Sequence, residues 1–197
     1  PAAVPVEAVH APASAPDRSK RTLSLVGPRA PACGVGDFAR GYARAVAGAE
    51  PGRHRSLVLS RSEGAPSAVW AALDTADTLV CNLPLVAWKR VIARPLAALV
   101  LARLRGRRVV VMLHEWAALA KARRATCLPA LALADRIVMF SPTVLAELAA
   151  DPAAGRFARK AILAPMPPSL TRPQHTTPSR LSSELARHRA AGRLMIG

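Results

Sequence analysis

The sequence predicts an α/β domain built on a doubly wound parallel sheet, and three observations support this fold class. Short β-rich runs alternate with amphipathic helical stretches along most of the chain. Residues 109–113 and 137–140 are apolar at every position, which is typical of strands that helices cover on both faces. A loop containing Gly34 and Gly36 joins the first strand to the first helix. Right-handed crossovers between such strands give a doubly wound sheet.

The pattern predicts six strands and five helices. The strands are expected at 22–26, 56–60, 78–83, 108–113, 136–140 and 161–164, and the helices at 37–49, 68–73, 85–104, 117–134 and 142–149. Asp37 can cap the helix that follows Gly36, and Ser141 with Pro142 forms an N-cap and first-position pair. Pro95 should bend or split the 85–104 helix.

The composition indicates four segments. Residues 1–21 are rich in Ala and Pro and predict a flexible leader, and residues 22–170 form the α/β domain. Residues 171–192 are polar and punctuated by proline, as expected for a connector between domains. The run 193–197 resembles the first strand of a second domain that is cut off. We therefore expect the chain to be a fragment.

The charge balance is strongly basic. Lys and Arg number 28 against 12 acidic residues, which gives a formal net charge of +16. The basic residues are scattered, so a compositional habit of the source genome explains them as well as a functional surface does. Among functional partners, an anionic membrane surface is favoured over nucleic acid. Base stacking needs interleaved aromatic residues, and the chain holds one Tyr and three Phe.

Cysteine usage and hydropathy limit the remaining classes. Cys33, Cys81 and Cys127 are far apart in the sequence, which fits a reducing cytosol and no disulfide framework. No His or Cys cluster has the spacing of zinc ligands, so no metal is expected. The most hydrophobic stretch, 85–104, is interrupted by charged residues and proline, which excludes a membrane-spanning helix. A cytoplasmic protein, peripheral at the inner face of the membrane, is expected.

The glycine segment Gly34-Val35-Gly36 predicts a phosphate site. A helix N-terminus after a glycine loop gathers unpaired backbone N–H groups, which favour an anion. The segment also matches the variant dinucleotide fingerprint G-x-G-x-x-A. However, Gly34 lies eight residues after the first strand, and no acidic residue follows the second strand to hold a ribose. An NAD(P) site is therefore disfavoured, and a tight turn that needs glycine for its conformation alone stays open as an alternative.

Four segments, in order, resemble the N-terminal domain of family 4 glycosyltransferases, which have the two-domain GT-B fold. The first is the glycine loop and the helix that continues as Asp-Phe-Ala-Arg-Gly-Tyr-Ala-Arg to residue 46. The second is the buried strand that ends in His114-Glu115, and the third is the strand 134–141, Ala-Asp-Arg-Ile-Val-Met-Phe-Ser. The fourth is Ile-Leu-Ala-Pro-Met-Pro-Pro at 162–168. The resemblance implies a Rossmann-like half of a GT-B enzyme.

The resemblance also implies a set of site residues. His114 would line the donor-sugar pocket as the catalytic residue, orienting a hydroxyl or meeting developing charge, unless it is only a hydrogen-bonded residue at the sheet edge. Gly34, Val35 and Gly36 would meet the donor phosphate. The acceptor or sugar pocket would include Asn82, Glu115, Trp116 and Ser141. The alternative for Glu115 is a solvated loop residue, and for Trp88 and Trp116 it is a place in the core.

The predicted function is therefore transfer of a sugar from a nucleotide-sugar donor to a glycan or lipid-linked acceptor, with retention at the anomeric carbon. No cofactor is expected beyond the nucleotide sugar as co-substrate. The resemblance places most donor contacts in a C-terminal domain, so we expect this chain alone to be inactive. A non-catalytic basic α/β binding module is the alternative function, followed by an NAD(P)-dependent enzyme.

Overall fold

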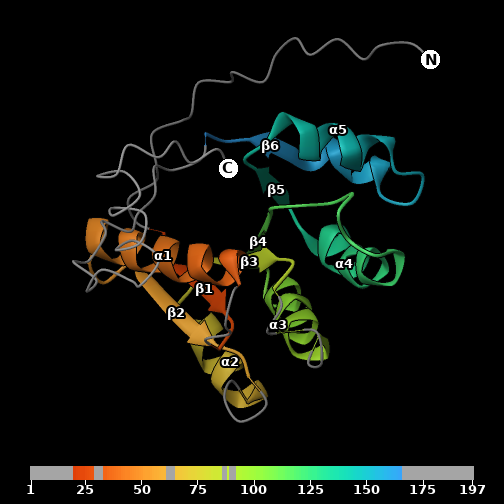
Figure 1. Ribbon diagram of the computed structural model, residues 1–197. Helices are drawn as coiled ribbons and strands as arrows, with labels where there is room; N and C mark the ends of the chain where they lie inside the picture. The colour runs from red at the N-terminus through yellow and green to blue at the C-terminus, as the bar shows by residue number, and fades with distance from the viewer. Residues whose placement is uncertain (1–19, 29–32, 61–64, 86–87, 89–91, 166–197) are drawn as a thin grey trace, which may run out of the picture. The chain divides into compact units, whose positions relative to one another are not determined.

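The fold is α/β, with a six-stranded, all-parallel sheet flanked by helices in a Rossmann-like, doubly wound arrangement (Figure 1). The computed structural model describes residues 20–28, 33–60, 65–85, 88 and 92–165. The described helices and strands lie in one unit that ends at Met166. The strand order across the sheet is β2-β1-β3-β4-β5-β6. The predicted fold class is confirmed.

Three strands have the bounds expected from the sequence, and three differ slightly. The strands are β1 (Thr22–Val26), β2 (His54–Val58), β3 (Thr78–Leu83), β4 (Arg108–Leu113), β5 (Arg136–Met139) and β6 (Ala161–Leu163). The second strand begins two residues earlier than predicted because its pairing with β1 sets Thr22 opposite His54. Residue 54 is polar, so the apolar pattern alone did not include it.

The helices follow the predicted order but not all of the predicted bounds. They are α1 (Gly34–Ala49), α2 (Pro66–Asp74), α3 (Ala93–Leu104), α4 (Lys121–Leu133) and α5 (Pro142–Ala150), followed by the 3₁₀ helix η2 (Gly155–Lys160). Of the helix expected at 85–104, the structure describes α3, which begins at Ala93 with Pro95 in its first turn, so Pro95 lies at a helix start and not at a bend inside a helix. Proline is tolerated there, because the N–H groups of a first turn have no intrahelical partner.

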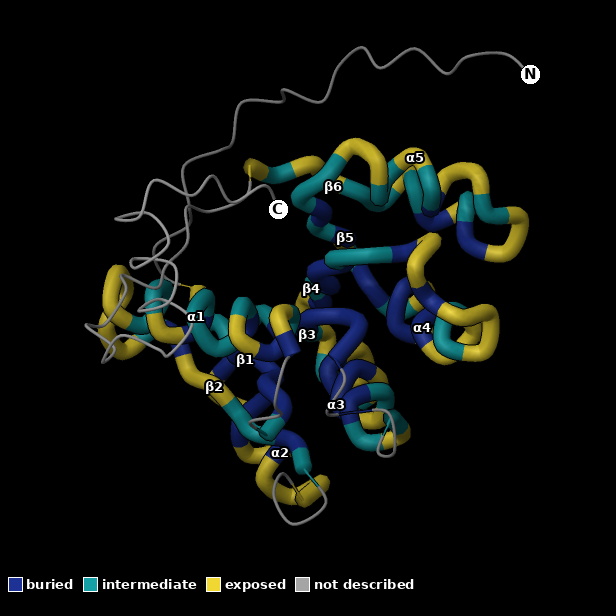
Figure 2. Tube along the Cα trace, in the orientation of Figure 1, coloured by how far each residue is buried: buried dark blue, intermediate teal, exposed yellow. Residues whose placement is uncertain are grey.

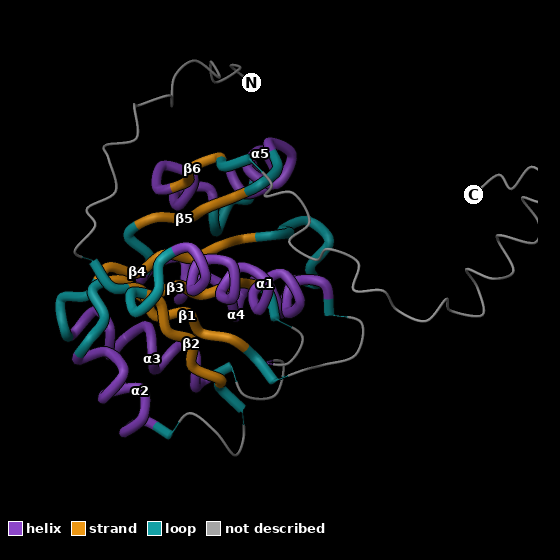
Figure 3. The backbone as a smooth tube through the Cα atoms, turned by 90° about the vertical axis from the view of Figure 1, so that its left-hand side faces the viewer, coloured by secondary structure: helices purple, strands orange, loops and turns teal. Residues whose placement is uncertain are grey.

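The two faces of the sheet are covered unequally. Helices α2, α3, α4 and α5 pack on one face, where alternate residues of the central strands form the main hydrophobic core. Among the described helices, only α1 lies on the other face, where it packs over β1, β2 and β3 (Figure 3). There Val26 of β1 packs with Ala39 and Ala43 of α1 in a smaller cluster. Burial is deepest along β1, β3 and β4 (Figure 2).

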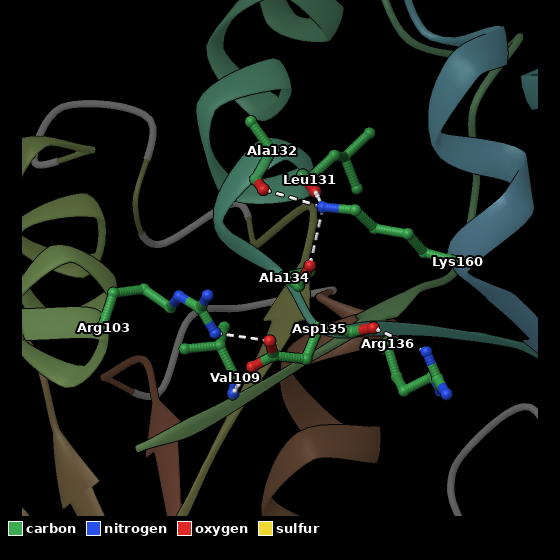
Figure 4. Close-up of polar contacts among 8 residues, drawn as sticks. All are labelled: Arg103, Val109, Leu131, Ala132, Ala134, Asp135, Arg136 and Lys160. Carbon is green, nitrogen blue, oxygen red and sulfur yellow. Dashed lines mark hydrogen bonds and ion pairs between the residues drawn. The ribbon is translucent and has the colours of Figure 1, made fainter. Parts of the chain in front are cut away.

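A polar network ties α4 to the edge of the sheet (Figure 4). The ammonium of Lys160 donates to the backbone carbonyls of Leu131, Ala132 and Ala134, at 3.4, 2.8 and 2.8 Å. Asp135, the next residue, accepts the backbone N–H of Val109 at 2.7 Å and pairs with Arg103. The Lys160 contacts satisfy carbonyls at the end of α4 that lack an intrahelical donor. The Asp135 contacts join the residue after α4 to β4 and α3.

Several predictions fall on residues outside the described ranges. These are most of the 1–21 leader, the start of the predicted 85–104 helix, the 171–192 connector and the strand at 193–197. Within the described ranges, no helix has both the length and the apolar character needed to cross a bilayer.

Candidate functional site

The strand order locates a crevice at the carboxyl ends of the strands. From β1 the chain moves outward to β2 on one side, and from β3 it moves outward on the other, so the order reverses between β1 and β3. Ligands of open α/β sheets bind outside the carboxyl ends of the strands at such a switch point. The predicted site residues near the ends of β3, β4 and β5 lie toward this edge: Asn82 is the last residue but one of β3, His114 follows β4 and Ser141 comes shortly after β5.

His114 lies at the centre of this edge, directly after β4. Its backbone N–H donates to the Leu83 carbonyl at 3.0 Å, which extends the pairing of β4 with β3 by one residue. Its ring packs edge-on against Phe38 of α1, with centroids 4.6 Å apart, and against Phe140, 5.4 Å away. The first two turns of α1 and the ends of β3, β4 and β5 therefore meet around one imidazole.

Burial lowers the pKa of His114 to about 4, so the ring is neutral at neutral pH. Its Nε2 lies 3.0 Å from Asn82 Oδ1. With the Asn82 oxygen facing the ring, Nε2 carries the proton and Nδ1 keeps a lone pair; an amide turned the other way would select the opposite tautomer. The neutral ring is thus an acceptor for a hydroxyl group and not a cation that neutralises phosphate. Of the two roles that the resemblance implies for His114, orienting a hydroxyl group fits a neutral ring better than meeting developing charge does.

Asn82 does not reach solvent, although the sequence placed it in the acceptor pocket. Its side chain is fully buried in β3, and its only hydrogen bond among the described residues is the one to His114. Its Nδ2 has no partner in that part of the chain. The acceptor-pocket assignment is corrected on this ground: Asn82 orients the imidazole of His114 from inside the sheet.

Gly34, Val35 and Gly36 form the first turn of α1 and not a loop, with Cys33 at the N-cap position. The proposed cap, Asp37, is instead the first residue whose N–H bonds within the helix, to the Cys33 carbonyl at 2.9 Å. The three preceding N–H groups lack an intrahelical acceptor and point out of the helix start, where an anion is favoured. Whether an anion binds at these donors stays a prediction.

The two glycines have different surroundings. A Cβ on Gly34 would meet nothing within 4 Å, whereas a Cβ on Gly36 would lie 3.2 Å from the buried Cys33 sulfur. The Val35 side chain packs on the main core. A larger side chain at position 36 would crowd Cys33, whereas no described residue stands in the way of a side chain at position 34.

Trp116 is a core residue, so its assignment to a sugar pocket is corrected. Its side chain is 1% exposed, and its indole N–H donates to Asp151 at 3.0 Å. Asp151 also pairs with Arg124 at 3.1 Å and accepts two backbone N–H groups beyond α5. The indole thereby connects the segment after β4 to the end of α5, and no face of it is free for stacking.

Glu115 points to the opposite face of the sheet from His114. It lines a cavity of about 500 Å³ between α4 and the segment that precedes α3, whose walls are mostly apolar and include Leu83, Trp88 and Cys127. Burial raises the pKa of the Cys127 thiol, so it is not a thiolate. The cavity opens at the carboxyl edge but does not include His114.

Ser141 occupies the predicted N-cap position of α5, directly after Phe140. Its side chain makes no capping hydrogen bond, and Pro142 follows at the first helical position. The residue is partly buried at the carboxyl edge, next to the ring that contacts His114. Ser141 therefore lies close to His114, and its hydroxyl does not cap α5.

Sequence reasoning missed the two phenylalanines that enclose His114. Phe38 was noted only as part of the glycine segment, and Phe140 only as the end of a strand. Each lies about 5 Å from the imidazole, at centroid distances of 4.6 and 5.4 Å. Adjacent strand ends could have suggested Phe140, but Phe38 requires the placement of α1 over the sheet.

The described residues offer no support for a dinucleotide site or for a metal site. Gly34 lies eight positions after Val26, the last residue of β1, and β2 is followed by Leu59 and Ser60 with no acidic residue. Within the described residues, no group of three or more His, Cys, Asp or Glu side chains could hold a metal ion. Comparison with protein-family models, curated proteins and solved structures returned no match for this chain.

Proposed function

We propose that this chain is the acceptor-side, N-terminal domain of a GT-B glycosyltransferase that moves a sugar from a nucleotide-sugar donor to a glycan or lipid-linked acceptor, with retention. The observation that carries the proposal is the contact between His114 and the N-terminal part of α1, with ring centroids of His114 and Phe38 4.6 Å apart. It brings a neutral hydroxyl acceptor and three N–H groups that have no acceptor within the helix to one edge of the sheet. The four ordered sequence segments support the same function.

Each part has a role in the transfer. Negative charge builds on the leaving diphosphate in the transition state, and fixed N–H dipoles stabilise such charge. Gly34, Val35 and Gly36 supply those dipoles. His114 accepts a hydrogen bond from a sugar hydroxyl through Nδ1, and Asn82 fixes the ring for this. The nucleotide itself would bind mainly to a second domain, as in the family that the sequence resembles.

Gly34→Pro tests the phosphate role in the enzyme with its donor-binding domain. Proline is favoured at the first helical position, so this change removes one N–H and preserves the helix. The transfer rate should fall at least about 10-fold, with circular dichroism and melting temperature unchanged. Gly48→Ala, near the other end of the same helix in open space, is the matched control and should keep full activity. Equal activity of the two variants would contradict the phosphate role.

His114→Ala tests the sugar role in the enzyme with its donor-binding domain. The transfer rate should fall about 10- to 1000-fold, while the affinity for the free nucleoside diphosphate changes little. His114→Gln should recover part of the rate, because glutamine keeps an amide that can face Asn82 and still bind a hydroxyl. Normal transfer by His114→Ala would leave His114 as a packing residue and remove the basis of the proposal.

A further inference from the structure

The amino-end edge of the sheet, opposite the candidate site, is bordered by arginines. Arg21 precedes β1, Arg53 precedes β2 and Arg107 precedes Arg108 at the start of β4. The register aligns Thr22 with His54 and Thr78, and Thr78 with Arg108. These basic residues therefore follow one another along a single edge. Two acidic residues also lie on this edge: Asp77, before β3, pairs with Arg107 at 3.9 Å, and Asp135, before β5, pairs with Arg103.

Two of these arginines, Arg21 and Arg53, share a hollow beside α2 with Arg55 of β2. Arg21, Arg53 and Arg55 line a pocket of about 260 Å³ together with the end of α2. In the described part of the chain, neither Arg53 nor Arg55 forms an ion pair. The C-terminal end of α2 adds a partial negative charge of about half an elementary charge, which three guanidinium groups outweigh. The hollow thus attracts anions.

Large apolar side chains stand exposed next to this basic edge. Leu104 is 77% exposed at the end of α3, Val100 is 43% exposed one turn earlier, and Trp70 of α2 is 47% exposed. The Arg105 guanidinium lies 3.5 Å from the Trp70 ring centroid and pairs with Asp74. Helices α2 and α3 contact each other, and Figure 2 shows exposed stretches on both. Exposed apolar groups bordered by charge mark an interaction surface.

We propose that this surface, formed by Trp70, Val100 and Leu104 with the arginines of the amino-end edge, docks on an anionic membrane. Tryptophan and arginine suit the boundary between lipid headgroups and acyl chains, where one part of a side chain is apolar and the other polar. Each basic residue near an anionic bilayer adds to the attraction. The charge complementarity selects an anionic lipid surface over a neutral one, and Leu104 and Val100 have no role in binding a nucleic-acid backbone.

This orientation bears on the acceptor, in a step that rests on the proposed function. Strands of six residues span about 20 Å, so His114 would stand roughly that far from the lipid. The reacting group of the acceptor would then have to extend from its lipid by a comparable distance. An elongated glycan on a lipid carrier fits this requirement better than a short headgroup.

Vesicle binding tests the surface directly and does not depend on transfer activity. At low salt the chain should sediment with phosphatidylcholine vesicles that contain about 30% phosphatidylglycerol, and this binding should weaken as the salt concentration rises. The chain should not sediment with vesicles of phosphatidylcholine alone. Trp88 and Trp116 are each 1% exposed, so a blue shift in tryptophan fluorescence on binding reports Trp70. That shift should vanish in Trp70→Phe.

Variants identify the face. Leu104→Ser should weaken vesicle binding about 5-fold or more, and the double change Arg53→Gln with Arg55→Gln about 10-fold at low salt. Leu163→Ser is the matched control, because Leu163 is 49% exposed at the carboxyl end of β6. Equal binding to neutral vesicles, equal effects of Leu104→Ser and Leu163→Ser, or tighter binding to duplex DNA that Leu104→Ser leaves unchanged would overturn the proposal.

Discussion

Two histidines are held neutral by burial, and they make the fold sensitive to acid. Burial lowers the pKa of His114 to about 4. The pKa of His54 is also lowered, chiefly by burial, with nearby Glu50 opposing the shift. Both ring nitrogens of His54 lack a partner in the described part of the chain, and its ring packs against Tyr42 at 6.3 Å between centroids. Charging either ring inside the fold is unfavourable.

The first prediction concerns pH. An unfolded histidine takes up a proton near pH 6.5, while these folded ones do not, so stability is complete above that pH and is lost as pH falls. At pH 5 the loss from His114 is about 2 kcal/mol. Urea unfolding at pH 7, 6 and 5 should show a shallower decline for His114→Gln and for His54→Phe than for the wild type. Parallel declines in all three proteins would contradict this account.

Single residues also show how far sequence reasoning reached. His114 was placed correctly at the end of β4, because an apolar strand that stops at a polar residue marks the carboxyl edge of a sheet. The role of Asn82 was not predicted, although β3 and β4 are neighbours and their ends meet. The sequence identifies which residues reach the edge but not which side chain turns inward, since burial depends on the packing of α1 over that face.

At the scale of elements, apolar strands were predicted well and helix starts poorly. β1, β3 and β4 have their predicted bounds because each is a short, mostly apolar run that polar or charged residues precede. α1 begins three residues before the predicted start, because Gly34 and Gly36 are weak helix formers and resemble a loop. Close packing on Cys33 favours glycine at position 36, and such a tertiary contact leaves no mark in a propensity pattern.

The second prediction concerns the end of α4, where Lys160 caps three carbonyls. Lys160→Met keeps the aliphatic part of the side chain and removes the charge-assisted hydrogen bonds. The free energy of unfolding should fall by about 1–2 kcal/mol. Arg159→Met is the control, because Arg159 is exposed and makes none of these contacts. Chemical denaturation of both variants measures the free energy of unfolding. Equal decreases in the two variants would show that the stability depends only on the charge of the 3₁₀ helix η2 and not on the Lys160 hydrogen bonds.

At the scale of the whole molecule, unequal coverage of the sheet sets the pattern of local stability. β1 and β3 are covered on both faces, by α1 on one and by α2 and α3 on the other. β6 is an edge strand of three residues, with Ile162 and Leu163 exposed. Its opening therefore exposes little additional apolar surface, whereas opening β3 disrupts the main core.

The third prediction follows from this difference and is read by amide hydrogen exchange. Amides of β3 should exchange only through global unfolding, so their opening free energy should equal the free energy of unfolding measured by denaturant. Amides of β6 should exchange through local opening, with a free energy lower by several kcal/mol. A destabilising change in the core, such as Leu79→Ala, should then accelerate β3 and leave β6 nearly unchanged. If β6 instead accelerated in step with β3, the edge strand would belong to the same cooperative unit as the centre of the sheet.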